Sequence, residues 1–240
     1  MPPRTAAPQT GAPRATRLAI PAYVHPSDTS AWSSILDARP SIVVINPGSG
    51  PGDIPSDPSY VDLVTRVRAE SPSTAVLGYV PIGWGKRDLD DVLADATKHD
   101  DWFGVDGIFW DQAPGADAAI DTSAFDRLAA LDGFAANGLR RGPGFSAFNP
   151  GVPVDRAWID AIPSAVWVTF EGPETEYPDA LHNPLNRYRP DHQWHIVHSA
   201  IPHSVVALAS SVVPGLGFLF TTLDVPANPY DEFASFAPVG

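Results

Sequence analysis

The chain of 240 residues contains 15 Lys and Arg against 28 Asp and Glu, which gives a formal net charge of −13. A hydrophobic fraction of 44% is enough to bury a sizeable core, so the composition excludes a disordered protein. The basic residues are scattered, which makes nucleic acid a poor partner because phosphate binding requires clustered cations. No apolar run approaches the roughly 18 residues of a membrane span. Cysteine is absent, which excludes disulfides and thiolate metal sites.

The acidic balance has two interpretations. It keeps a protein soluble and monomeric, which is the interpretation we favour, or it attracts a cationic substrate such as a polymer with free amino sugars. Residues 1–17, rich in Pro and Ala, lack the apolar stretch of a secretory signal and are expected to form a disordered tail. We expect one domain at 18–240. Cytoplasmic location and prior removal of a leader both stay open.

Eight short apolar runs follow the tail. They are continuous rather than alternating, which is typical of parallel strands covered on both faces. The predicted strands are 18–24, 41–46, 75–80, 105–111, 144–149, 165–171, 194–199 and 215–221.

Helical patterns fill the gaps between these runs. The clearest apolar stripe has the spacing of one helix face and follows Asp57 and Pro58, a cap and a first-turn proline. The stripes are Tyr60-Leu63-Val64-Val67, Leu89-Val92-Leu93-Ala96 and Phe125-Leu128-Leu131-Ala135. Weaker helices are predicted at 28–38, 155–161, 174–188, 203–213 and 230–236.

Eight strands that alternate with helices predict a single-domain (β/α)₈ TIM barrel, which typically takes about 250 residues. An open doubly wound sheet is the alternative. Such a sheet usually carries a glycine-rich turn after its first strand, whereas the first strand here ends in Tyr23-Val24-His25-Pro26.

The active site of a TIM barrel lies at the carboxyl ends of its strands. Polar side chains stand at that end of most predicted strands, so we expect them to form a ring around the barrel mouth. The residues are Tyr23, His25, Asn46, Tyr79, Asp111, Gln112, Asn149, Glu171 and His198.

Two acids in this ring, Asp111 and Glu171, end runs that are otherwise hydrophobic. A carboxylate there is costly unless it faces a polar cavity. Two carboxylates across one mouth are the minimum for glycoside hydrolysis. The alternative is structural: each acid caps a helix or pairs with an arginine. The alternation of a strand places Trp167 and Thr169 on the same face as Glu171.

Aromatic side chains near the mouth are candidate sugar-stacking platforms. Trp84, in a loop between two glycines, is the best of these, and Tyr79 and Trp167 are the others. Aromatic residues on buried strands more often pack in the core, which is our interpretation of Trp110 and Trp158.

Two other motifs are set aside. The segment 46–52, NPGSGPG, lacks the Lys-Ser/Thr ending of a phosphate-binding loop, and its prolines remove amide donors. His192, His195 and His198 are spaced by three, so an extended strand places His195 opposite the other two, which argues against a zinc site. We therefore expect neither a metal nor an organic cofactor.

Five segments together resemble the spherulin-4-like family, also called spherulation-specific family 4. They are IPAYVHP, VVINPGSGPG, VLGYVPIGWGKR, VDGIFWDQ and FNPG…VTFE, and the resemblance as a whole covers about Leu18 to Thr221. The resemblance implies a secreted or cell-surface (β/α)₈ glycoside hydrolase whose acidic site falls on Asp111 and Glu171. It also implies a substrate with α-1,4-linked N-acetylgalactosamine, as in galactosaminogalactan. The family commonly shows Asp-Glu where this chain has Asp111-Gln112.

The sequence therefore predicts a retaining, endo-acting glycosidase with a polysaccharide or oligosaccharide substrate. Asp111 is expected to act as nucleophile or stabiliser and Glu171 as acid/base, with the reverse order open. The other ring residues would position the sugar. One alternative is a non-catalytic carbohydrate-binding barrel, which Gln112 favours. An aldolase or isomerase is less favoured, because no predicted strand contains the lysine that such enzymes often use.

Overall fold

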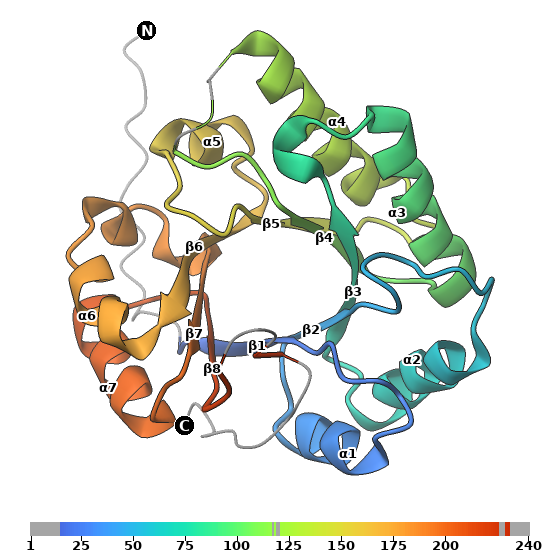
Figure 1. Ribbon diagram of the computed structural model, residues 1–240, viewed down its shortest axis with the longest axis horizontal. Coiled ribbons are helices and arrows are strands. Elements are labelled where there is room, and N and C mark those ends of the chain that lie inside the picture. Colours follow the sequence, from blue (N-terminus) through green and yellow to red (C-terminus); the bar gives the residue numbers. More distant parts are fainter. Residues whose placement is uncertain (1–14, 117, 119–120, 226–228, 231–240) are drawn as a thin grey trace, which may run out of the picture.

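The computed structural model describes residues 15–116, 118, 121–225 and 229–230. Its eight strands close into one parallel barrel in chain order, and the helices surround the barrel (Figure 1). The predicted (β/α)₈ fold is confirmed, and every predicted strand overlaps an observed one. The strands are β1 (Arg17–Pro21), β2 (Ile42–Ile45), β3 (Ala75–Pro81), β4 (Gly107–Asp111), β5 (Phe145–Asn149), β6 (Val166–Pro173), β7 (Gln193–His198) and β8 (Phe218–Thr221).

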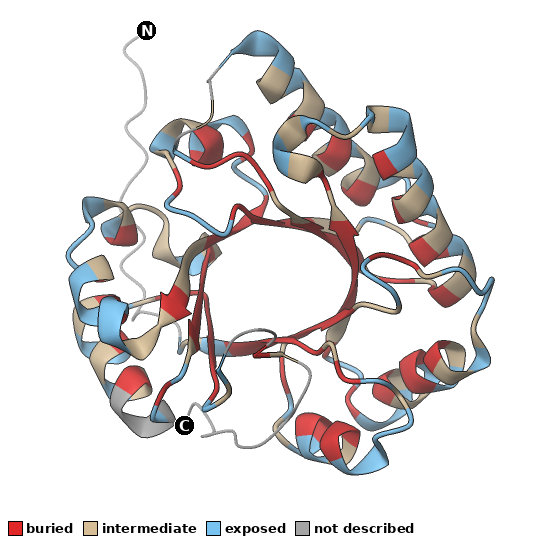
Figure 2. Cartoon of the chain, in the orientation of Figure 1, coloured by how far each residue is buried: buried red, intermediate tan, exposed pale blue. Residues whose placement is uncertain are grey.

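The helices form where capping residues and apolar stripes coincide. Asp57, Asp88 and Asp121 each accept a hydrogen bond from a first-turn N–H and so begin three long helices. The helices are α1 (Thr29–Asp37), α2 (Pro58–Glu70), α3 (Leu89–Phe103), α4 (Thr122–Asn137), α5 (Arg156–Ala161), α6 (Tyr177–Ala180) and α7 (Pro202–Val212). Figure 2 shows the buried residues on the helix faces that meet the barrel.

The helix predicted at 174–188 is wrong. This segment instead forms η2 (Glu174–Glu176), α6 and η3 (Pro184–Arg187), because prolines interrupt any longer helix. The helix predicted at 230–236 lies outside the described residues apart from Tyr230. Residues 1–14 of the predicted tail also lie outside them. Arg17, assigned to that tail, begins β1.

Residues paired between neighbouring parallel strands point to the same face of the barrel wall. Tyr79 pairs with Phe109, and both rings lie inside, where Phe109 also meets Trp194. Trp110 and Phe148 pair on the outer face and stack there under the helices. The inward alternation of β4 therefore continues from Phe109 to Asp111, as the sequence predicts.

Strand β6 departs from simple alternation. Val168 pairs with Trp194 and Phe170 with His195, so Thr169 is an extra residue in a β-bulge. Trp167, before the bulge, pairs with Phe148 and stacks on it outside the barrel. Glu171, after the bulge, is on the inner face. The prediction that Trp167 shares the face of Glu171 is wrong, because the bulge reverses the phase of the strand.

None of the helices in the described part of the chain combines the length and apolar character that crossing a bilayer requires. The predictions that Trp110 and Trp158 pack in the core are confirmed, since both side chains are fully buried. Their indole N–H groups donate to Ser146 Oγ and to the Gly115 carbonyl, respectively.

Gly78 on β3 has no space for a side chain. An ideal Cβ there would lie 2.4 Å from Cγ of buried His99, whose Nε2 is 2.8 Å from the Tyr79 carbonyl oxygen. We expect Gly78→Ala to lower the free energy of unfolding by about 1–3 kcal/mol, the usual range for overpacking. Urea denaturation would measure this. Gly133→Ala, where nothing lies within 4 Å in α4, is the control, and we expect it to be neutral or stabilising by up to about 1 kcal/mol. Equal stability of the two variants would contradict the prediction.

Candidate active site

A pocket of about 280 Å³ opens at the carboxyl ends of the strands. It contains both acids predicted from the sequence, together with five of the predicted sugar-positioning residues. Its lining consists of Tyr23, Tyr79, Trp84, Asp111, Gln112, Asn149, Pro150, Gly151, Val152, Glu171 and Tyr230.

Asp111 ends β4 and is held by neighbours on both sides. Tyr79 on β3 donates its hydroxyl to Asp111 Oδ2 at 2.6 Å. Asn149 lies on β5, where it pairs with Asp111 in the register of the two strands. Its side-chain amide donates to Asp111 Oδ1 at 2.9 Å. The parallel register therefore places Asn149 beside Asp111, while Tyr79, which pairs with Phe109, reaches Asp111 from one layer below.

Glu171 on β6 receives its own pair of donors. The Asn149 Nδ2 that binds Asp111 also lies 2.7 Å from Glu171 Oε2, and the Tyr230 hydroxyl donates to Oε1. The Gly151 N–H binds Asn149 Oδ1 at 3.1 Å, which turns the amide nitrogen toward the acids. Because one nitrogen contacts both acids at 2.9 and 2.7 Å, the two contacted oxygens lie no further apart than the 5.6 Å to which these distances add.

Burial governs the protonation of this cluster. It raises the pKa of the Asp111 carboxyl, and the negative charge of Glu171 raises it further, while the Tyr79 and Asn149 hydrogen bonds act in the opposite direction. Burial and the nearby acids also raise the pKa of Tyr23, Tyr79 and Tyr230. The three phenols therefore stay neutral and are available as hydrogen-bond donors.

The three tyrosines form one wall of the pocket. The Tyr23 ring meets Tyr79 and Tyr230 edge-to-face, each at a centroid distance of 5.5 Å. The backbone N–H of Tyr23 donates to the Tyr230 carbonyl at 3.1 Å. These contacts hold the Tyr79 hydroxyl on Asp111 and the Tyr230 hydroxyl on Glu171.

Gln112 and Trp84 lie at the rim. Both have positive φ angles, of 55° and 52°, and the Trp84 N–H donates to the Gln112 carbonyl at 2.6 Å. Such backbone is uncommon for residues other than glycine and is often found at functional sites. The indole of Trp84 is 54% exposed, as a sugar-stacking platform requires.

Four predicted positioning residues are not brought into the pocket. His25 is exposed and hydrogen-bonded to Ser27, and Asn46 Oδ1 accepts from the Gly50 N–H within its own loop. His198 lies beside Ser199. Trp167 is fully buried outside the barrel wall, which corrects its predicted role in binding.

The three histidines of the 192–198 segment lie in different surroundings. His195 is buried outside the barrel, where its Nδ1 contacts the Tyr177 hydroxyl at 2.8 Å, and His192 contacts the Ala165 carbonyl. Within the described residues, no group of three or more His, Cys, Asp or Glu is arranged to hold a metal ion.

Tyr230 is the pocket residue with a polar side chain that the sequence interpretation missed; the other missed lining residues are Pro150, Gly151 and Val152. It follows β8 in a segment without an apolar stripe, and its only signal was an aromatic residue beyond the last strand. Phe220 on β8 lies beside its ring, at a centroid distance of 6.2 Å.

We expect Tyr230→Phe to lower kcat about tenfold or more, because Glu171 would lose a charge-assisted hydrogen bond, worth about 1.5–3 kcal/mol. Steady-state kinetics on the substrate proposed below would measure the loss. Tyr188→Phe, which removes a hydroxyl that binds Asp160 on the surface, is the control. If both variants turned over at the same rate, Tyr230 would have no part in the site.

The structure is a closed (β/α)₈ barrel with two hydrogen-bonded acids in its mouth. The sequence model of spherulation-specific family 4 matches residues 17–237. The chain belongs to this family, as its motifs predict.

Two relatives are informative. Spherulin-4 of Physarum polycephalum is 30% identical over 179 residues, which are 72% of this chain and 47% of that protein, so the chain spans about half the length of this relative. The crystal structure of Aspergillus clavatus Sph3, solved in complex with GalNAc, superposes with a TM-score of 0.78. It is 24% identical, and the match covers 91% of this chain and 92% of that one. This likeness confirms the fold.

Proposed function

We propose that this protein is a retaining, endo-acting glycoside hydrolase. Its substrate is a polysaccharide that contains α-1,4-linked galactosamine or N-acetylgalactosamine. The observation that carries the proposal is the contact of one Asn149 amide with both Asp111 and Glu171 in the mouth pocket. Family membership and the GalNAc bound by Sph3 support the choice of sugar.

The separation of the acids favours retention. Retaining glycosidases hold their two carboxyl groups about 5–5.5 Å apart, whereas inverting enzymes leave about 6.5–9.5 Å for a water molecule. The upper limit of 5.6 Å between the contacted oxygens of Asp111 and Glu171 fits the first class.

The raised pKa of Asp111 supports the acid/base role for this residue, the reverse of the order that the sequence favoured. Asp111 donates a proton to the glycosidic oxygen as Glu171 attacks the anomeric carbon, so the bond to the leaving sugar breaks and a glycosyl ester forms. Asp111 then takes a proton from water, which attacks the anomeric carbon, breaks its bond to the Glu171 oxygen and releases the Glu171 carboxylate. Tyr79, Tyr230 and Asn149 hold the two acids in place.

Purified protein incubated with galactosaminogalactan, and with its de-N-acetylated form, would test this function. We expect oligosaccharide products by mass spectrometry, and NMR should show that the first product keeps the α configuration. Inverted products would overturn the retaining mechanism. Binding of either polymer without cleavage would replace the hydrolase with a carbohydrate-binding barrel, the alternative that Gln112 favours.

The raised pKa of Asp111 also predicts how stability depends on pH. The folded protein binds this proton more tightly than the unfolded chain, so its stabilising effect is complete below the unfolded pKa of about 3.9 and is lost as pH rises through the folded value. Above the unfolded pKa, ionisation of the buried carboxylate destabilises the fold. We therefore expect Asp111→Asn to raise the Tm at pH 7, by about 2–4 °C for each kcal/mol in a chain of this size, and less at pH 4. Calorimetry at the two pH values would measure this, and a lower Tm at pH 7 would contradict it.

A further inference from the structure

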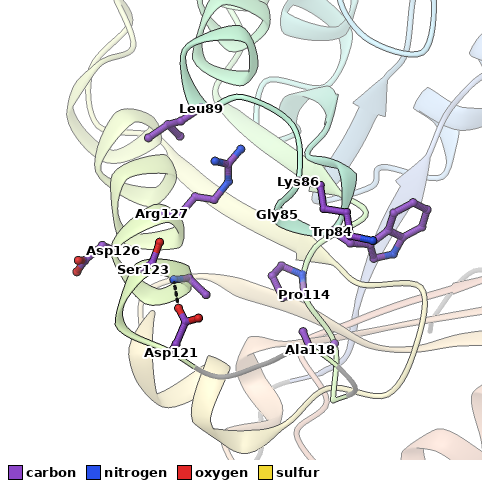
Figure 3. Close-up of a pocket in the computed structure, with 12 residues that line it drawn as sticks. Trp84, Gly85, Lys86, Leu89, Pro114, Ala118, Asp121, Ser123, Asp126 and Arg127 are labelled. Atoms are coloured by element: carbon purple, nitrogen blue, oxygen red, sulfur yellow. Dashed lines mark hydrogen bonds between the residues drawn. The ribbon is translucent and has the colours of Figure 1, made fainter.

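A second cavity, larger than the first, lies beside the barrel mouth (Figure 3). Its volume is about 810 Å³, against about 280 Å³ for the mouth pocket. It lies between the loops that follow β3 and β4 and the first turns of α4. We call it the lateral groove and define it by Trp84, Lys86, Leu89, Pro114, Ser123 and Arg127.

Trp84 lines both the lateral groove and the mouth pocket. Figure 3 shows its indole turned away from α4. Gly83, Trp84 and Gly85 all have positive φ angles, so this short segment, fixed to the Gln112 carbonyl, presents the indole as a ridge between the two cavities. A chain molecule that leaves the mouth over this ridge enters the groove.

The polar side chains that line the groove are the cations Lys86 and Arg127, the acids Asp121 and Asp126, and the Ser123 hydroxyl. Arg127 Nε is buried and has no hydrogen-bond partner within the described residues, although the same guanidinium donates to the Arg87 carbonyl. Lys86 is exposed and forms no salt bridge with any other described residue. The carboxylate of Asp121 already accepts from the Ala124 N–H as the cap of α4.

Between these polar groups the surface is apolar, with Leu89 and Pro114 at its sides (Figure 3). Donors, acceptors and apolar surface in one groove match the hydroxyl and N-acetyl groups and the C–H faces of sugar rings. Ligand pockets commonly have volumes of about 300–1,000 Å³. The mouth pocket, at about 280 Å³, lies just below that range, whereas the groove, at about 810 Å³, lies within it.

We propose that the lateral groove binds further N-acetylated sugar units of the same polymer whose cleaved bond lies in the mouth pocket, with Trp84 as the step between the two. The proposal rests on the hydrolase function given above. It makes the enzyme prefer long chains, because only these reach both cavities.

The test fills the groove without altering the mouth. Ser123 is exposed at the second position of α4, so Ser123→Trp places an indole in the groove, and Ser30→Trp at the second position of α1 is the matched control. The probes are α-1,4-linked N-acetylgalactosamine oligomers of three and nine units. We expect the ratio of kcat/KM for the nonamer to that for the trimer to fall about tenfold in Ser123→Trp, the equivalent of about 1.4 kcal/mol, and to stay unchanged in Ser30→Trp.

Binding of the nonamer to Glu171→Gln protein, measured by calorimetry with and without Ser123→Trp, separates the two proposals. If the wild type cleaves but Ser123→Trp keeps the wild-type length preference, the groove proposal fails and the hydrolase stands. If no oligomer is cleaved, the hydrolase proposal fails, and weaker nonamer binding in Ser123→Trp still supports the groove. Equal nonamer affinity in both proteins would overturn the groove proposal in either case.

Discussion

Asp111→Asn is expected to lower kcat on the polymer by about 10²–10⁴, the usual contribution of a positioned acid/base. Glu171→Gln should lose at least as much, because the glycosyl ester can no longer form. Both side chains keep the size of the originals, so the barrel should stay folded. Asp62→Asn and Glu70→Gln, on the exposed surface of α2, are the controls and should leave kcat within twofold.

Azide distinguishes the roles of the two acids. In Asp111→Ala, with an aryl α-N-acetylgalactosaminide that needs no protonation of its leaving group, azide should intercept the glycosyl ester and give an α-glycosyl azide. In Glu171→Ala, azide should attack the substrate directly and give the β product. If Asp111→Ala instead gave the β-glycosyl azide and Glu171→Ala the α product, Asp111 would be the nucleophile and Glu171 the acid/base. Turnover near that of the wild type in both variants would contradict the proposed mechanism.

Asn149→Ala is expected to lower kcat about 10²–10³-fold, the range for the loss of one preorganised donor in an active site. Its amide contacts both acids, so both lose a hydrogen bond at once. The amide also lowers the pKa of Asp111. Without it that pKa rises further, so the fall of kcat/KM on the alkaline side should move to higher pH.

A pH profile of kcat/KM separates this effect from a loss of folded enzyme, which would scale the profile without moving it. Asn137→Ala, which removes an exposed contact with the Gly133 carbonyl at the end of α4, is the control. A profile for Asn149→Ala that kept its position on the pH axis would show that the amide does not act on Asp111.

The sequence predicts the barrel well because parallel strands covered on both faces must be continuous apolar runs, and these are visible without structural information. The same logic identifies Asp111 and Asn149, whose strands alternate regularly to their ends. It fails for Trp167, since nothing in a run of apolar residues marks the extra Thr169.

Residues supplied by loops were harder to predict. His25 and Asn46 stand at strand ends, yet local hydrogen bonds with Ser27 and Gly50 turn their side chains to their own loops. Tyr230 reaches Glu171 from 59 residues further along the chain. Such a contact depends on tertiary packing and leaves no periodic signal.

The bulge at Thr169 also means that the two halves of β6 do not share one inside–outside alternation. Trp167, before the bulge, packs on the outer face of the barrel, and Glu171, after it, faces the mouth pocket. Substitutions that repack the outer shell around Trp167 can therefore accumulate without rotating Glu171 away from its partner. We expect deletion of Thr169 to turn the Glu171 side chain toward the helices and away from Asp111.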